Sequence, residues 1–321
     1  GFVYDVTIFF FGVYDINPNG MKYTLLLIST ILLFNSNLHA KKSVYPKKID
    51  GFVFIPSGSC TPEGTTYSIH AMFMADHEVT NGEYLKFLRD LASQNRMEDL
   101  KTAMPDTTAW NLPGTYLNPY VEYYLRHPAY ADFPVVNISA EGAKLYCIWL
   151  GEKLSALYEN ERFKKMRLPT THEWMYAATG GLENAVYSWG TPYVRTGNGE
   201  MQGNFLVLGD ESISQIDSTY QIVSGANTYG IAGNLSDYAD VTAPSKSYKP
   251  NAYGLYNMSG NVAELVQDFI SGDSSLTSTS YAAMGGSWKS PGYDVRITSK
   301  TSFTKANPMV GFRPCFTHLS E

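Results

Sequence analysis

Residues 259–264, with the sequence Ser-Gly-Asn-Val-Ala-Glu, carry the residue types that bind a hard cation. Calcium prefers about six to eight oxygen ligands, many of them backbone carbonyls presented by a turn, together with one or two carboxylates. A glycine turn at Gly260 exposes carbonyl groups, and the acid Glu264 follows shortly after it. The segment therefore predicts a structural calcium site. The alternative for Glu264 is an ordinary carboxylate near the N-terminus of a helix.

The chain has three cysteines, Cys60, Cys147 and Cys315, so any pairing leaves one thiol over. Cys147 lies in the amphipathic helical pattern of residues 140–150, and Cys315 follows the last strand-like run, residues 310–314. One pair is favoured over three free thiols in an exported protein. A bridge between Cys147 and Cys315 would join the C-terminus to the first half of the domain and leave Cys60 unpaired. The alternative is two buried thiols that pack as small hydrophobic groups.

The N-terminal segment predicts export. Met21 and Lys22 open a basic region, residues 23–34 form an apolar run that is short for a bilayer span, and Ala40 suits signal peptidase. We expect an upstream or disordered extension at residues 1–20, a signal peptide at 21–40, and a folded domain at 41–321 with no transmembrane span. An uncleaved anchor and a buried N-terminal helix are the alternatives. No cysteine follows the apolar run, so the sequence offers no lipobox.

Composition narrows the classes of partner. The 321 residues are 44% hydrophobic, enough to bury the core of one large domain or two small ones. The net charge of -6 argues against a polyanion such as nucleic acid as a partner. The exported protein would be soluble in an oxidising compartment.

The pattern along the chain indicates one continuous domain. Strands are predicted at residues 52–56 and 73–79, and a helix over 81–91 in which Thr80 is the cap and Glu83 completes a capping box. A second helix is predicted to begin with Thr171 as its cap and to end at Ala178. Residues 105–133 form a tyrosine-rich insertion. Residues 179–248 form a loop so long that something besides backbone ladders must hold it.

These motifs, in this order, resemble the formylglycine-generating enzyme, or sulfatase-modifying factor, family. The resemblance covers nearly all of residues 41–321, and it implies a single irregular α+β domain related to the C-type lectin fold, with little regular secondary structure and often braced by calcium. The matching residues are His77 to Tyr84, Phe133 to Val136, Tyr146 to Gly151, Arg167 to Trp174, Tyr187 to Gly190, Asn251 to Val262, Gly285 to Trp288 and Gly311 to Pro314.

The resemblance also implies particular ligands. It places one calcium ion on the Ser259, Gly260 and Val262 carbonyls and the Glu264 carboxylate. It places a second on Asn204, the Phe205 carbonyl, Asp237 and the Ala239 carbonyl, which would pin the long loop. The alternative for Asp237 is a solvated turn. The family's disulfide fits Cys147 and Cys315, although Pro314 shifts the register by one residue.

The catalytic thiols of the family are absent. The resemblance implies oxidation by two cysteine thiolates that hold copper(I), an ion that soft ligands select. The positions that match them carry Ser290 and Val295, beside Ser287 and Trp288 of the same signature. We therefore predict no catalytic residues at these degenerate active-site positions, and no copper. The histidines form no metal-binding array, and we expect packing or surface roles for His39, His70, His77, His127, His172 and His318.

A narrower branch of the family suggests a role. Residues 125–136 and 230–251 resemble the gliding-motility GldJ and GldK lipoproteins of the Bacteroidetes and the related PorK. The resemblance implies a non-catalytic structural or interaction protein of gliding motility and type IX secretion. Its partners would be envelope or secretion-machinery proteins, in the periplasm or at the surface of a Gram-negative, Bacteroidetes-like cell. The alternatives are a formylglycine-generating oxidase with an unrecognised site and a lectin-like module that binds glycans or peptides.

Overall fold

The computed structural model describes residues 48–113, 115–206, 213–216, 219–222, 239, 241–269 and 281–318. Contacts divide the chain into residues Gly1–Lys42 and Ser43–Glu321. The predicted extension and signal peptide, including Ala40, lie outside the described residues, as does Asp237. No described helix combines the length and the apolar character needed to cross a membrane.

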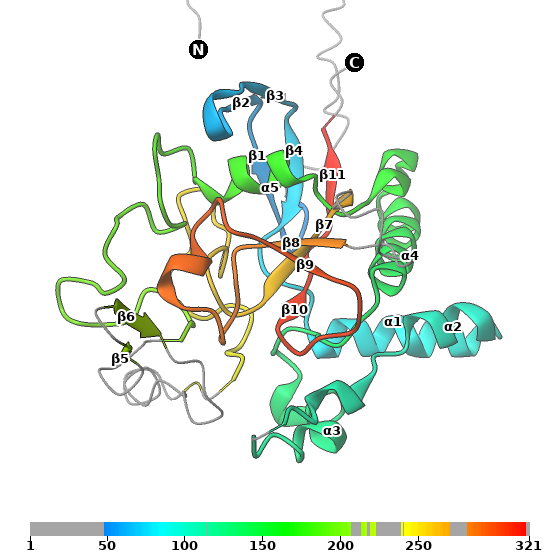
Figure 1. The fold of residues 1–321 in the computed structure, drawn as a ribbon. Coiled ribbons are helices and arrows are strands. Elements are labelled where there is room, and N and C mark those ends of the chain that lie inside the picture. The colour runs from blue at the N-terminus through cyan, green and yellow to red at the C-terminus, as the bar shows by residue number, and fades with distance from the viewer. Residues whose placement is uncertain are drawn as a thin grey trace, which may run out of the picture. The chain divides into compact units, whose positions relative to one another are not determined.

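Short helices and strands separated by irregular segments make up the described part of the chain (Figure 1). The helices are α1 (Asn81–Ser93), α2 (Met97–Ala103), α3 (Tyr120–Tyr123), α4 (Ala140–Tyr158) and α5 (Thr171–Ala178). The strands are β1 (Phe52–Ile55), β2 (Gly58–Cys60), β3 (Tyr67–Ile69), β4 (Met72–Ala75), β5 (Ile213–Ile216), β6 (Thr219–Ile222), β7 (Ala263–Phe269), β8 (Tyr281–Met284), β9 (Lys300–Phe303), β10 (Val310–Gly311) and β11 (Cys315–Thr317). The protein is a mixed α+β fold with little regular secondary structure, as the sequence predicts.

Two sheets carry the core. In the first, β4 lies between β1 and β11 and pairs with both in antiparallel register. In the second, the strand order is β10-β7-β8-β9, and β10 runs parallel to β7. The largest apolar cluster joins residues of α1 and α4 to β7 and β11. A second cluster lies between α5, β4 and β8. Strands from both ends of the chain therefore close the core.

Local signals place the helices well. Thr80 caps α1, and Glu83 accepts from the Thr80 backbone N–H at 2.9 Å, so the predicted capping box is confirmed. The second helix ends at Ala178 as predicted, but its cap is Thr170. Thr171 is the first helical residue, because the side chain of Thr170 accepts from the backbone of the third helical residue, which is the capping geometry. The prediction of Thr171 as the cap is wrong.

The predicted strand at 73–79 ends earlier than expected. β4 stops at Ala75, and the next residues leave the ladder. The Asp76 N–H donates to the Gly51 carbonyl, and the Val79 N–H donates to the Phe312 carbonyl. The apolar run 73–75 and Val79 suggest a longer strand, although Asp76, His77 and Glu78 interrupt the pattern. The bend turns Glu78 into the interior.

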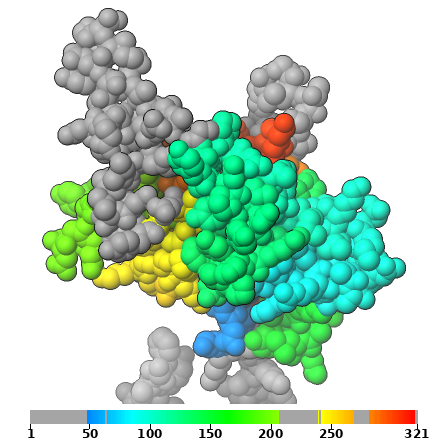
Figure 2. Space-filling model, turned by 90° about the horizontal axis from the view of Figure 1, so that it is seen from below, coloured from blue at the N-terminus to red at the C-terminus, as the bar shows by residue number. Residues whose placement is uncertain are grey.

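The tyrosine-rich insertion is ordered by contacts to distant segments. Asn81 donates from its amide to the carbonyls of Tyr124 and Tyr130, both at 3.0 Å. The Tyr124 hydroxyl bonds to Pro134 and to Thr242. Figure 2 shows residues 105–133 between the cyan helices α1 and α2 and the yellow segment that begins at residue 241. The insertion is thus fixed to the start of α1 and to the end of the long loop.

Candidate functional site

The degenerate positions lie on the turn that follows β8. Gly286 has φ +65°, and a Cβ at this position would lie 2.3 Å from the Asp294 carbonyl and 2.8 Å from a methyl group of Val295. Such contacts are closer than any side chain allows, so only glycine fits here. This close approach packs the Ser287 turn against the short helix Gly292–Val295. The two halves of the signature are therefore held together as the resemblance implies.

Ser290 is tied into its own turn. Its Oγ accepts from the Ser287 backbone N–H at 3.0 Å and lies 3.2 Å from the Ser287 hydroxyl. Its backbone N–H donates to the Ser287 carbonyl, and its carbonyl accepts from the Leu206 N–H. None of these partners is a general base, and a serine without one is a weak nucleophile at neutral pH. Trp288 anchors the same turn from Nε1 to the Pro308 carbonyl at 3.2 Å.

Val295 is completely buried. It packs with Tyr187, Met201 and Phe205 in an apolar cluster beneath the signature turn. The Tyr187 hydroxyl closes this cluster by donating to the Gly292 carbonyl at 2.9 Å. The place of the second thiol thus holds an apolar side chain with no ligand atom.

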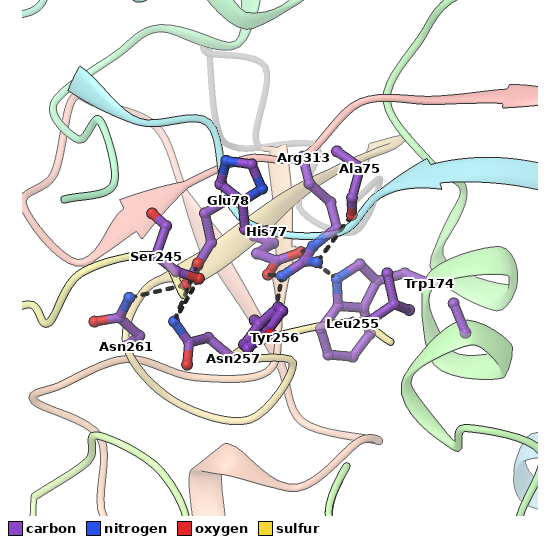
Figure 3. Close-up of polar contacts among 12 residues, drawn as sticks. Ala75, His77, Glu78, Trp174, Ser245, Leu255, Tyr256, Asn257, Asn261 and Arg313 are labelled. Atoms are coloured by element: carbon purple, nitrogen blue, oxygen red, sulfur yellow. Dashed lines mark hydrogen bonds and ion pairs between the residues drawn. The ribbon is translucent and has the colours of Figure 1, made fainter. Parts of the chain in front are cut away.

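A buried ion pair crosses from the second sheet to the segment after β10 (Figure 3). Arg313 donates from Nε to Glu264 Oε2 at 2.6 Å and from Nη2 to Oε1 at 2.5 Å, and neither residue is exposed. Trp174 donates from Nε1 to the same Oε2 at 2.7 Å. The remaining guanidinium bonds go to the carbonyls of Ala75 and Tyr256. The group therefore ties α5, β4, β7 and the 251–262 loop together.

A second buried acid stands beside this pair. Glu78 is unexposed and accepts from Asn257 at 3.2 Å and from Asn261 at 2.9 Å. Burial raises its pKa to about 7, because Arg313 offsets only part of the desolvation and Glu264 adds like-charge repulsion. Two carboxylates thus share one guanidinium. Asn257 Oδ1 and Ser245 Oγ, both buried, accept or donate no hydrogen bond among the described residues.

The first predicted calcium set does not fit the ion in this arrangement. The carboxylate of Glu264, the only charged group of the set, is held by a guanidinium on both oxygens. A hard cation needs a carboxylate whose charge is not already neutralised. The turn itself is built as expected, since Gly260 has φ +91° and its N–H donates to the Gly285 carbonyl. Ser259 and Val262 are buried on either side of it.

The second predicted calcium set is described only in part, since Asp237 lies outside the described residues. Asn204 is buried and donates to the Val241 carbonyl at 2.7 Å and to Asn261 Oδ1 at 3.2 Å. Its carbonyl accepts from the Asn261 N–H, so the two predicted sets adjoin. Phe205 belongs to the apolar cluster of Val295. No group of three or more His, Cys, Asp or Glu in the described segments could hold a metal. Calcium at Asn204 and Ala239 stays a prediction.

The predicted disulfide is not formed in this structure. Cys147 and Cys315 are free thiols, 1% and 0% exposed. Burial raises the pKa of both, and the neighbouring Cys315 raises that of Cys147 further. Arg167 donates to Cys315 Sγ at 3.4 Å. The two thiols therefore interact electrostatically within the core, and the disulfide between them stays a prediction.

His77 joins a surface-facing ion network. It bonds to Asp76 through Nδ1, and its Nε2 lies 3.6 Å from Glu83 Oε1. Burial lowers its pKa, but the two carboxylates outweigh this and raise it to about 9. Lys246 completes the network with Asp76 at 3.0 Å. His77 therefore takes part in an ion network with Asp76 and Glu83.

The buried residues Glu78, Asn257, Asn261, Glu264 and Arg313 form an interior cluster. The sequence analysis gives a role only to Glu264, as a calcium ligand. Glu78, Arg313, Asn257 and Asn261 all lie within the quoted motifs, but none received a role there. The available signal is Arg313, a charged residue within the largely apolar run of residues 310–316; Glu78 follows two polar residues and carries no such signal. Such residues are rarely buried without a partner.

Comparison with known proteins shows the family of this chain. A model of the sulfatase-modifying factor enzyme 1-like domain matches residues 39–317. The chain is 27% identical over 228 residues to the formylglycine-generating enzyme of Bos taurus, which covers 63% of this chain and 50% of the enzyme. It is 28% identical over 191 residues to the inactive C-alpha-formylglycine-generating enzyme 2 of Bos taurus, covering 57% and 50%. The chain spans about half the length of the curated relatives it matches.

A solved structure shows the same fold. PvdO from Pseudomonas aeruginosa superposes with a TM-score of 0.54 at 20% sequence identity, covering 83% of this chain and 94% of that one. At this identity the similarity establishes the fold alone. With the family model matching most of its length, the chain belongs to the sulfatase-modifying factor enzyme 1-like domain family.

Proposed function

We propose that this protein is a non-catalytic member of its family that acts as a structural or interaction component. The observation that carries the proposal is the state of the two thiol positions. Ser290 is bonded within its own turn, and Val295 is sealed in an apolar cluster. Copper(I) requires soft ligands, and these two side chains offer none. The match to an inactive relative in Bos taurus supports the same reading.

The scaffold around these positions is retained. Gly286 still brings the two halves of the signature together, and the Glu264–Arg313 pair still joins the two sheets. A chain that keeps the fold but lacks the sulfur atoms that would bind copper fits a role in which its surface binds other proteins. We place this role in the cell envelope, among the components of gliding motility and type IX secretion, on the resemblance of residues 125–136 and 230–251 to GldJ, GldK and PorK.

The catalytic half of the proposal is tested by peptide conversion. The protein is incubated with copper and a Cys-x-Pro-x-Arg peptide, and conversion of the cysteine to formylglycine is followed by mass spectrometry. We expect no conversion and no stoichiometric binding of copper(I). Conversion by the unmodified protein would overturn the proposal in favour of an oxidase.

Restoring the thiols provides the matched control. The double variant Ser290→Cys/Val295→Cys supplies two soft ligands on the retained scaffold, whereas Ser290→Cys supplies one. We expect copper(I) binding in the double variant only. Equal binding by the unmodified protein would show that the ion is held elsewhere.

The envelope role is tested by purification from the native envelope after mild cross-linking. Secretion-ring subunits that copurify with the protein would support the proposal. Retention on immobilised glycan without such subunits would favour a lectin-like module instead.

A further inference from the structure

A cavity of about 580 Å³ lies outside the degenerate positions, none of which lines it. One wall is the end of β2 with Cys60, and the opposite wall is the C-terminal part of α5 with the loop that follows. α5 packs against β2 and β3, as Figure 1 shows near the top of the view. Met175 and Ile297, both buried, and the partly buried Tyr176 and Tyr253 also line it.

Hydrogen bonds and a close glycine contact fix the position of Tyr253 in the wall of this cavity. Asn251 donates to the Ala177 carbonyl at 2.9 Å and accepts from the Tyr253 N–H at 3.0 Å, which fixes Tyr253 against the end of α5. Gly181 has φ +82°, and a Cβ there would lie 3.0 Å from the Tyr253 hydroxyl. The Tyr253 hydroxyl donates to that of Tyr176 at 3.4 Å. The wall thus consists of two linked phenols held by backbone contacts.

The electrostatic character of the cavity is negative. Among the residues that line it, Glu183 is the only one with a formal charge, and no lysine, arginine or histidine lines the wall. Glu183 is exposed, and none of the ion pairs between described residues includes it. The faces of aromatic rings also attract cations.

We propose that this cavity binds a small organic cation, a protonated amine whose charge faces Glu183 and whose carbon chain lies against Met175 and Ile297. The phenols serve as neutral hydrogen-bonding groups, since burial and the neighbouring Tyr176 raise the pKa of Tyr253 to about 12. The amine can belong to a free metabolite or to a lysine side chain of a peptide. The inference does not rest on the proposed function, because it uses none of the degenerate positions.

Calorimetry with defined probes tests the charge selectivity. The probes are butylammonium as a free amine, N-acetyl-glycyl-lysyl-glycinamide as a peptide lysine, acetate as an anion and glucose as a neutral polyol. We expect binding of at least one amine and of neither control. Binding of the peptide alone would assign the ligand to a lysine side chain, and binding of both amines to the ammonium group itself.

A matched pair of substitutions locates the site. Glu183→Gln removes the charge at the rim of the cavity, and Glu152→Gln makes the same change at an exposed position on α4. Both side chains are exposed, so both variants should fold. We expect Glu183→Gln to weaken amine binding about threefold, the effect of losing an exposed ion pair. Glu152→Gln should bind as the unmodified protein does.

Cys60 supplies an independent readout. It lines the cavity, whereas Cys147 and Cys315 are buried, so Cys60 is the thiol among these three that a maleimide reaches in the folded protein. A bound amine should slow its labelling, and glucose should not. The proposal is overturned if glucose or acetate protects Cys60, if amine binding survives unchanged in Glu183→Gln, or if no amine binds at millimolar concentration.

Discussion

The two buried acids of the interior cluster should respond in opposite ways to the same substitution. Glu78 and Glu264 are both unexposed, and each can be changed to the isosteric glutamine. Glu264→Gln removes the carboxylate that accepts from both Nε and Nη2 of Arg313, and breaking a buried ion pair in this way costs about 3–5 kcal/mol. Glu78→Gln removes the surplus negative charge instead. The pair of variants therefore separates a required charge from an excess one.

The expected size of the Glu78 effect follows from its pKa. A rise from 4.5 to about 7 on folding corresponds to about 3 kcal/mol, at about 1.4 kcal/mol per pKa unit. Since the folded protein holds this proton more tightly than the unfolded chain does, the penalty is absent below pH 4.5. It grows as the pH rises and is fully present above about pH 7. Asn257 Oδ1, which has no partner in the described structure, offers an acceptor for the new amide.

Urea unfolding at pH 5 and pH 8 measures both variants against the unmodified protein. We expect Glu78→Gln to be more stable by up to about 3 kcal/mol at pH 8, with most of the gain lost at pH 5. Glu264→Gln should be destabilised at both pH values. The m-value must stay constant for the midpoints to report stability. A loss of stability in Glu78→Gln as large as that in Glu264→Gln, or a gain that does not change with pH, would refute the reasoning.

Three further predictions concern other parts of the fold. His77→Gln should lower the free energy of unfolding by up to about 3 kcal/mol at pH 6 and have no effect above about pH 9.5. Folding raises the pKa of His77 from 6.5 to about 9, so its charge stabilises the fold fully below pH 6.5, and this stability is lost as the pH rises through 9. Equal losses in urea unfolding at both pH values would contradict this prediction. Protein exported to an oxidising compartment should carry the Cys147–Cys315 bridge, so that reduction adds the mass of a pair of hydrogens; an unchanged intact mass rules the bridge out. Gly286→Ala should lower the melting temperature far more than Gly51→Ala, because both have positive φ but only Gly286 has a carbonyl within 2.3 Å of the new Cβ; similar losses would show that the contact relaxes.

The helix signals were readable because they are local. The cap and the third helical residue of α1 are three positions apart, and their side chains meet backbone groups within one turn. The same short range explains the error at Thr171. Thr170 and Thr171 are both suitable cap residues, but only Thr170 has a glutamate three residues later, so the capping box with Glu173 identifies Thr170 as the cap. The family motifs are also short and local, and the resemblance that they carry predicted an α+β fold with little regular secondary structure.

The use of Glu264 could not be read in this way. Its partners Arg313 and Trp174 are 49 and 90 residues away, and nothing near Glu264 in the sequence indicates that a guanidinium will reach it. A glycine turn followed by an acid fits a cation ligand and an ion pair equally well. The end of β4 at Ala75 also depends on distant backbone, because Val79 bonds to Phe312.

The interior cluster also sets the order in which the molecule can be completed. Glu78 obtains its donors 179 and 183 residues later in the chain, and Arg313 reaches back 238 residues to Ala75. A chain that emerges N-terminus first therefore leaves Glu78 without these donors until Asn257 and Asn261 have been synthesised. Closing loops of this length is slow, and contacts of high sequence separation form late in folding. The core of this protein can therefore be completed only after Arg313 has been synthesised.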